Sequence, residues 1–129
     1  MAVIGVGFDL VDIARAERLL AHHGERALGR LLTPDERAYV RRRPARAAHH
    51  VAARVAAKEA VYKALQTLEG AEAIGWQEIE VVRADRQRPV IALHGLARRI
   101  TDEVPGFRIH LSLSHTDATA GAAAVAERE

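Results

Sequence analysis

The sequence predicts an α+β fold in which an antiparallel sheet packs against helices, one of them long. Segments with strand and helix patterns follow in the order strand, helices, strand, strand, helix, strand, strand. Short turns join the later strands, which favours antiparallel pairing over a parallel, doubly wound sheet. The 129 residues, 49% hydrophobic and 28% charged, suit one domain over residues 1–129 with its own core.

The first half of the chain predicts one strand and three helices. Residues 3–10 form a short apolar run typical of a buried strand. Asp12 then resembles the N-cap of a helix that we expect to end at Gly24. The run Thr33-Pro34-Asp35-Glu36 begins a second, short helix, because it combines a cap, a proline and first-turn acids. The longest helix is predicted over about 46–68, where apolar residues recur at helical spacing.

The second half predicts four short strands and one more helix. We expect strands over residues 76–82, 89–93, 109–114 and 118–126, a turn over 85–88, a helix over 95–102 and a tight connection at 115–117. Gly121 lies inside the last strand, where a glycine often marks a bulge or a close backbone approach.

Composition narrows the classes of protein. The chain has no cysteine, which excludes disulfides and thiolate metal sites and permits a cytoplasmic location. We expect no signal peptide and no membrane span. Net charge is only +2, yet arginines gather at residues 41–46 and two histidines follow at 49–50. That patch suits an acidic partner, so a nucleic-acid-binding module is one hypothesis; scarce aromatics disfavour it, and we expect no nucleic acid partner.

A few residues could carry chemistry. Asp9 ends an apolar strand, so its carboxylate needs a partner: an ordinary ion pair, a cap interaction or a cation. Glu59 and Lys63 lie four residues apart on the long helix, which is typical of a surface ion pair but also of a carboxylate ligand beside a phosphate-binding ammonium. Arg54 and Lys58 lie on another side of that helix and could extend a phosphate site.

Three segments, in order and spacing, resemble the holo-acyl carrier protein synthase family of 4′-phosphopantetheinyl transferases. Gly5-Val-Gly-Phe-Asp9-Leu-Val-Asp12 is similar to the family's N-terminal segment. Arg54-Val-Ala-Ala-Lys58-Glu59-Ala-Val-Tyr-Lys63-Ala-Leu65 is similar to its signature helix and is the most specific match. Leu111-Ser-Leu-Ser114-His115 is similar to its C-terminal segment. The resemblance spans essentially the whole chain and implies a 4′-phosphopantetheinyl transferase-like fold.

The resemblance also implies a reaction and a site. The family moves the phosphopantetheine arm of coenzyme A onto a serine of an apo-acyl carrier protein and releases 3′,5′-ADP, using Mg²⁺. Asp9 and Glu59 would be the metal ligands, and Lys63 would neutralise phosphate charge. Glu59 would accept the serine proton, directly or through water, with Lys63 as an alternative. The implied catalytic residues are therefore Glu59, Lys63 and Asp9.

Further residues are implied for binding. Coenzyme A would be held by Arg54, Lys58, Lys63, Ser114 and His115. The acidic carrier protein would meet Arg15 and Arg18 on the first helix. The family also implies a homotrimer with active sites between subunits, and a role in fatty acid or polyketide synthesis.

Two departures from the family pattern keep a second hypothesis open. Gln66-Thr67-Leu68 replaces the usual glycine-containing loop, and Val55 replaces an aromatic residue. The alternative is therefore a non-catalytic homologue that binds coenzyme A or a carrier protein. Which carrier serves as acceptor, and whether acyl-coenzyme A is used, does not follow from the residues.

Overall fold

The computed structural model describes residues 1–83 and 86–129. Within these residues, five strands and four α-helices form two antiparallel sheets and a helical layer, which confirms the α+β prediction. The elements are β1 Ala2–Asp12, α1 Ile13–Leu31, α2 Pro34–Arg41, α3 Ala47–Leu65, β2 Ile79–Val82, β3 Val90–Leu93, α4 Gly95–Asp102, β4 Arg108–His115 and β5 Thr119–Arg128. Short 3₁₀ turns occupy Pro44–Arg46, Ala71–Ala73 and Trp76–Glu78.

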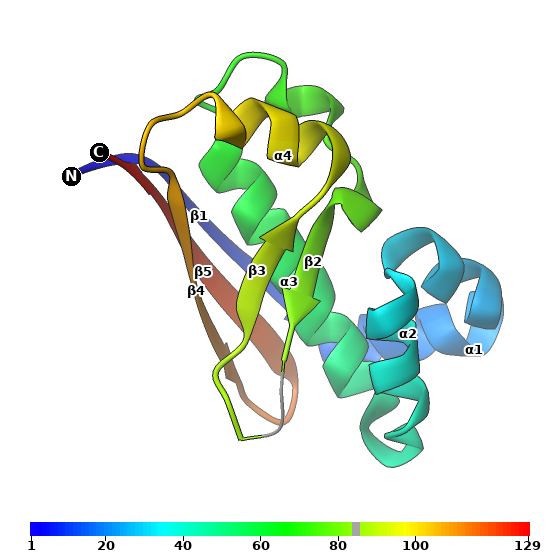
Figure 1. The fold of residues 1–129 in the computed structure, drawn as a ribbon. Coiled ribbons are helices and arrows are strands. Elements are labelled where there is room, and N and C mark those ends of the chain that lie inside the picture. The colour runs from blue at the N-terminus through cyan, green and yellow to red at the C-terminus, as the bar shows by residue number, and fades with distance from the viewer. Residues whose placement is uncertain (84–85) are drawn as a thin grey trace.

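The two sheets differ in size. One has three strands in the order β1-β5-β4, and the other is the β2-β3 hairpin. The long helix α3 lies against the three-stranded sheet, while α1 and α2 project together at one end (Figure 1). Both termini lie close together at the other end, near α4 (Figure 1).

Small residues let α3 lie very close to the sheet. Every second residue of β5 from 120 to 126 is a buried alanine, and α3 contributes five fully buried alanines at 52, 56, 57, 60 and 64. A Cβ built on Gly7 would lie 1.7 Å from the carbonyl oxygen of Ala60, and one on Gly5 would lie 1.7 Å from that of Ala64. No other side chain fits there, so these two glycines bring β1 into direct backbone contact with α3.

Most element boundaries agree with the sequence, and three differ. The first helix does not end at Gly24. It bends there, with Gly24 at φ 43°, and continues to Leu31, because Ala27 and Leu28 beyond the bend are buried in the core. Residues 76–78 form a 3₁₀ turn rather than strand, since the Glu78 carboxylate folds back to accept from the Gly75 amide at 2.8 Å.

The third difference concerns the end of α3, which lies at Leu65 rather than Leu68. The side-chain amide of Gln66 donates to the carbonyl oxygens of Tyr62 (2.9 Å) and Ala71 (3.2 Å). This bridge closes the segment that replaces the family's glycine-containing loop. The expected turn at 85–88 lies partly outside the described residues. At Gly121 the expected close backbone approach is not found: a Cβ built there would lie 3.1 Å from Cδ2 of Leu10 and 3.8 Å from the nearest backbone atoms, which is ordinary contact.

Burial of α3 is broader than its sequence pattern suggested. The three-stranded sheet covers one side of α3, and α1, α2 and β2 contact its other sides. Two charged side chains of this helix are therefore buried: Arg54 is 4% exposed and Lys58 is 1% exposed. Among the described residues, no helix is long and apolar enough to cross a bilayer.

Candidate active site

Asp9 is positioned by the close backbone contact that Gly5 and Gly7 allow between β1 and α3. Side chains alternate along a strand, so Asp9 shares the face of Gly5 and Gly7, which is the face turned to α3. Its carboxylate is 20% exposed and lies 3.3 Å from the ammonium of Lys63, which also donates to the Phe8 carbonyl oxygen at 2.9 Å. The ion pair joins β1 to α3 through two residues that lie 54 positions apart in the sequence.

Asp9 and Glu59 line the same cavity. The cavity has a volume of about 380 Å³ and lies between β1, the start of α1, α3 and the Trp76 turn. Arg15 and Val55 also line it. The structure thus brings together two carboxylates and two cations, Arg15 and Lys63, that come from three separate elements.

The chemistry of this set suits a hard divalent cation bound together with phosphate. Mg²⁺ takes one or two protein carboxylates and fills its other positions with water and substrate phosphate oxygens. Throughout residues 1–83 and 86–129, no group of three or more His, Cys, Asp or Glu side chains gathers in a metal-binding arrangement. A cation at Asp9 and Glu59 would accordingly need oxygens from a bound phosphate or water.

A second cavity, of about 360 Å³, contains the predicted Ser114 and His115. It lies at the β4 edge of the three-stranded sheet, on the other side of β5 from Asp9. Its lining also contains three arginines, Arg46, Arg83 and Arg88, together with His49 and His50. The arginines that cluster at residues 41–46 make separate contacts in the structure. Arg46 lines this cavity, Arg43 stacks on the Tyr39 ring, and Arg41 forms an ion pair with Glu25.

Arg54 lies beneath this basic cavity rather than in it. Its guanidinium stacks 4.2 Å from the Tyr39 ring centre, and one nitrogen donates to the His50 carbonyl oxygen at 3.3 Å. Burial lowers the pKa of Arg54. Burial, together with Arg54 and the other nearby arginines, also lowers the pKa of His50 to about 4, so this histidine is neutral at pH 7.

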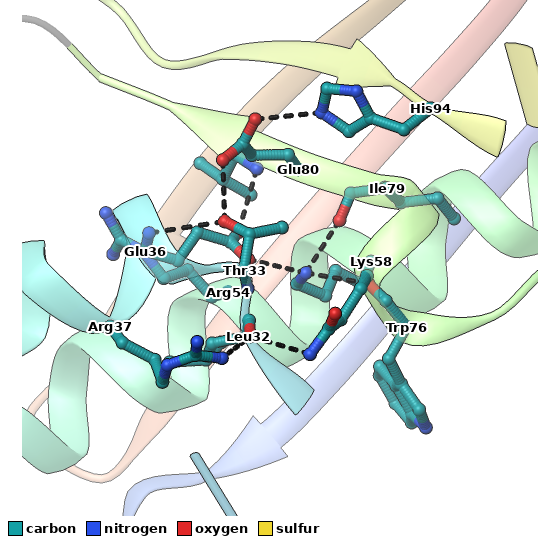
Figure 2. Close-up of polar contacts among 12 residues, drawn as sticks. Leu32, Thr33, Glu36, Arg37, Arg54, Lys58, Trp76, Ile79, Glu80 and His94 are labelled. Carbon is teal, nitrogen blue, oxygen red and sulfur yellow. Dashed lines mark hydrogen bonds and ion pairs between the residues drawn. The ribbon is translucent and has the colours of Figure 1, made fainter. Parts of the chain in front are cut away.

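Lys58 points in a different direction from Lys63. Its ammonium forms an ion pair with Glu36 at 2.6 Å and donates to two backbone carbonyl oxygens, as Figure 2 shows. Lys63, by contrast, has a half-exposed side chain beside Asp9. Of the two lysines that the sequence assigned to coenzyme binding, only Lys63 is at the open site.

The first helix presents Arg15 and Arg18 as exposed side chains. Around the bend at Gly24, the side chains of His23, Arg26 and Arg30 line a groove whose wall also includes Trp76. The sequence analysis missed this extension because it ended the helix at the glycine. It also missed Trp76 as a lining residue of both this groove and the Asp9–Glu59 cavity, although Trp76 is the single tryptophan of the chain.

Comparison with known proteins defines the class. The profile of the 4′-phosphopantetheinyl transferase superfamily matches residues 5–123, and the chain belongs to this superfamily. The relatives it resembles are holo-[acyl-carrier-protein] synthases. The protein of that name from Alkalilimnicola ehrlichii is 50% identical over 113 residues, which cover 87% of each chain.

Solved structures agree. The crystal structure of the holo-[acyl-carrier-protein] synthase from Neisseria meningitidis superposes with a TM-score of 0.85 at 29% identity, covering 98% of this chain and 100% of that one. The Bacillus anthracis synthase in complex with CoA (3′,5′-ADP) gives a TM-score of 0.78 at 31% identity and covers 98% of both chains. The fold predicted from the resemblance is therefore confirmed.

Proposed function

We propose that this protein transfers the 4′-phosphopantetheine arm of coenzyme A to the acceptor serine of an apo-acyl carrier protein and releases 3′,5′-ADP. The observation that supports this most strongly is the convergence of Asp9, Glu59 and Lys63 at one side of α3, in a chain of this superfamily. A relative that is 50% identical carries the synthase name, and three of the similar solved structures are complexes with coenzyme A.

The reaction is a phosphoryl transfer, in which positioning and charge stabilisation provide most of the acceleration. The serine oxygen forms a bond to the β-phosphorus of coenzyme A as the bridging P–O bond to 3′,5′-ADP breaks. We assign Asp9 and Glu59 as ligands of Mg²⁺, which when bound would draw negative charge from the pyrophosphate. Lys63, held beside Asp9, neutralises charge on the same phosphate oxygens. Glu59 accepts the proton that the serine hydroxyl loses.

The basic cavity at the β4 edge is the proposed site for the nucleotide part of coenzyme A. Ser114 and His115 line it together with Arg46, His49 and Arg83, and cations suit phosphate groups. Arg54 supports this cavity from below through His50 and Tyr39. In one chain the cavity and Asp9 lie on different edges of the sheet, which is compatible with a site completed by a neighbouring subunit.

A homotrimer is part of this proposal. The face of the three-stranded sheet that points away from α3 is apolar and open: Val6, Phe8 and Leu10 of β1 are each 58–65% exposed. Monomeric proteins rarely leave such a contiguous apolar surface in water. A second and third copy covering this face would bury it and would bring the edges of neighbouring sheets together.

The carrier protein docks, in this proposal, on the exposed side of α1 through Arg15 and Arg18. Opposite charge accelerates such an encounter and makes it sensitive to salt. The absence of cysteine is compatible with work in the cytoplasm.

The function is tested by incubating the protein with coenzyme A, MgCl₂ and a panel of apo-carrier proteins from fatty acid and polyketide synthesis, and then weighing each carrier. We expect at least one carrier to gain the mass of phosphopantetheine, and none to gain it when EDTA replaces MgCl₂. If no carrier gains this mass while the protein still binds coenzyme A, the non-catalytic alternative is correct.

A further inference from the structure

The buried ammonium of Lys58 has no hydrogen-bond donor left for a ligand. Its side chain is 1% exposed, and an ammonium has three donors. Three oxygens surround it: a Glu36 carboxylate oxygen at 2.6 Å, the Trp76 carbonyl at 2.8 Å and the Ile79 carbonyl at 2.6 Å (Figure 2). A direct contact with a coenzyme phosphate would require this set to break.

The counterion is itself held from two elements. The Glu36 carboxylate accepts from the Thr33 amide at 2.9 Å, which caps α2, and from the Val81 amide at 2.8 Å in β2. The Thr33 hydroxyl donates to Glu80 at 2.6 Å, and Glu80 also contacts His94 at 2.9 Å. Lys58 therefore joins α3 to a rigid hydrogen-bonded unit rather than to a mobile side chain.

The bonds of Lys58 connect two walls of the proposed active site. Glu59 follows Lys58 on α3, and the Trp76 carbonyl accepts from the Lys58 ammonium. The side chains of Glu59 and Trp76 line the same cavity as Asp9. They also line a smaller cavity of about 220 Å³ whose wall includes Lys58, Tyr62 and Gly75. The separation between α3 and the Trp76 turn is thus set by a buried contact directly behind Glu59.

We infer that Lys58 is a positioning residue: with Glu36, it fixes the Glu59 carboxylate and the Trp76 wall relative to each other, and it does not bind coenzyme A. This inference rests on the proposed function for the role of Glu59. It replaces the expectation, drawn from the sequence, that Lys58 binds the coenzyme.

A set of variants separates positioning from direct binding. Lys58→Met keeps an unbranched side chain that is one atom shorter, and Glu36→Gln keeps the shape of the glutamate. Each single change leaves an unpaired buried charge and can unfold the protein. The double variant K58M/E36Q removes both charges and is the main test. Val40→Ala, a buried truncation on α2 away from the cavity, is the control for general loss of stability.

The measurements are kcat, the Michaelis constant for coenzyme A, and the affinity of the protein for Mn²⁺ followed by electron paramagnetic resonance without substrate. For K58M/E36Q we expect kcat to fall about 10- to 100-fold, as when a catalytic group moves by about 1 Å. We expect Mn²⁺ affinity to fall about tenfold and the Michaelis constant for coenzyme A to stay within about twofold. Val40→Ala should change the melting temperature alone.

Two results would overturn the inference. A tenfold higher Michaelis constant for coenzyme A, with kcat and Mn²⁺ affinity unchanged, would show that Lys58 binds the coenzyme. Loss of stability with all three quantities equal to those of Val40→Ala would make Lys58 a purely structural residue. If the unaltered protein modifies no carrier, the proposed function fails, but Mn²⁺ and coenzyme binding still decide the placement of Lys58.

Discussion

Gly7→Ala tests how the active site is assembled. The added Cβ would lie 1.7 Å from the Ala60 carbonyl oxygen, whereas real Cβ contacts essentially never fall below 3.0 Å. Strand β1 must therefore move away from α3 by about 1.3 Å, the difference between these distances. Because the opposing atom is backbone, no rotamer change on α3 relieves the clash. We expect the free energy of unfolding to fall by about 3 kcal/mol, at the upper end for overpacked cores.

The displacement should reach the chemistry, because Asp9 lies two residues along the same face of β1. A catalytic group misplaced by about 1 Å can cost 100-fold in rate, so kcat should fall about 100-fold in the fraction that remains folded. The assays are urea denaturation and carrier modification. Gly29→Ala is the matched control, because Gly29 lies in α1 and a Cβ built on it has no atom within 4 Å. We expect this substitution to leave the free energy of unfolding unchanged or to raise it slightly. If Gly7→Ala has the same free energy of unfolding and the same kcat as Gly29→Ala, the close contact between β1 and α3 does not position Asp9.

Three other outcomes follow from the same geometry. Glu59→Gln should abolish turnover while the melting temperature stays near that of the unaltered protein, because Glu59 faces a cavity; full activity at limiting Mg²⁺ would contradict its assignment as a ligand. Arg18→Glu should raise the Michaelis constant for the carrier protein more than that for coenzyme A, with the difference shrinking at high salt; equal effects would remove α1 as the docking surface. The folded state lowers the pKa of His50 from 6.5 to about 4, so between these values the unfolded chain binds a proton that the folded chain does not. The melting temperature should therefore fall as pH drops through this range, and His50→Asn, measured by calorimetry across pH 4–7, should reduce that fall; an identical pH profile would contradict it.

The sequence was sufficient for features that depend on local chemistry. The Thr33–Glu36 capping box begins α2 as expected, with both reciprocal bonds formed. Alternating apolar residues and short turns predicted the antiparallel strands. A charge at the end of an apolar strand required a partner for Asp9, and Lys63 is that partner. The metal role of Asp9 and Glu59 came from the family resemblance alone and stays a prediction.

Tertiary contacts account for the rest. Helix α1 passes Gly24 because buried residues beyond the bend stabilise it, which local propensity cannot reveal. Lys58 and Lys63 lie on the same helix, yet one is buried against Glu36 and the other lies beside Asp9. Whether a lysine of α3 is buried depends on where α2 and β2 pack against the helix, and helical periodicity does not predict that position. Likewise, the role of Gly5 and Gly7 as the contact surface for α3 becomes visible only when strand and helix are seen together.

The most direct test of the site is to locate its metal. A crystal grown with coenzyme A and MnCl₂, measured at the manganese absorption edge, should show one anomalous peak within coordination distance of both the Asp9 and Glu59 carboxylates. The peak should be lost from crystals of Asp9→Asn. A manganese ion bound to only one of these carboxylates, or to neither, would contradict the shared site on which the proposed reaction depends.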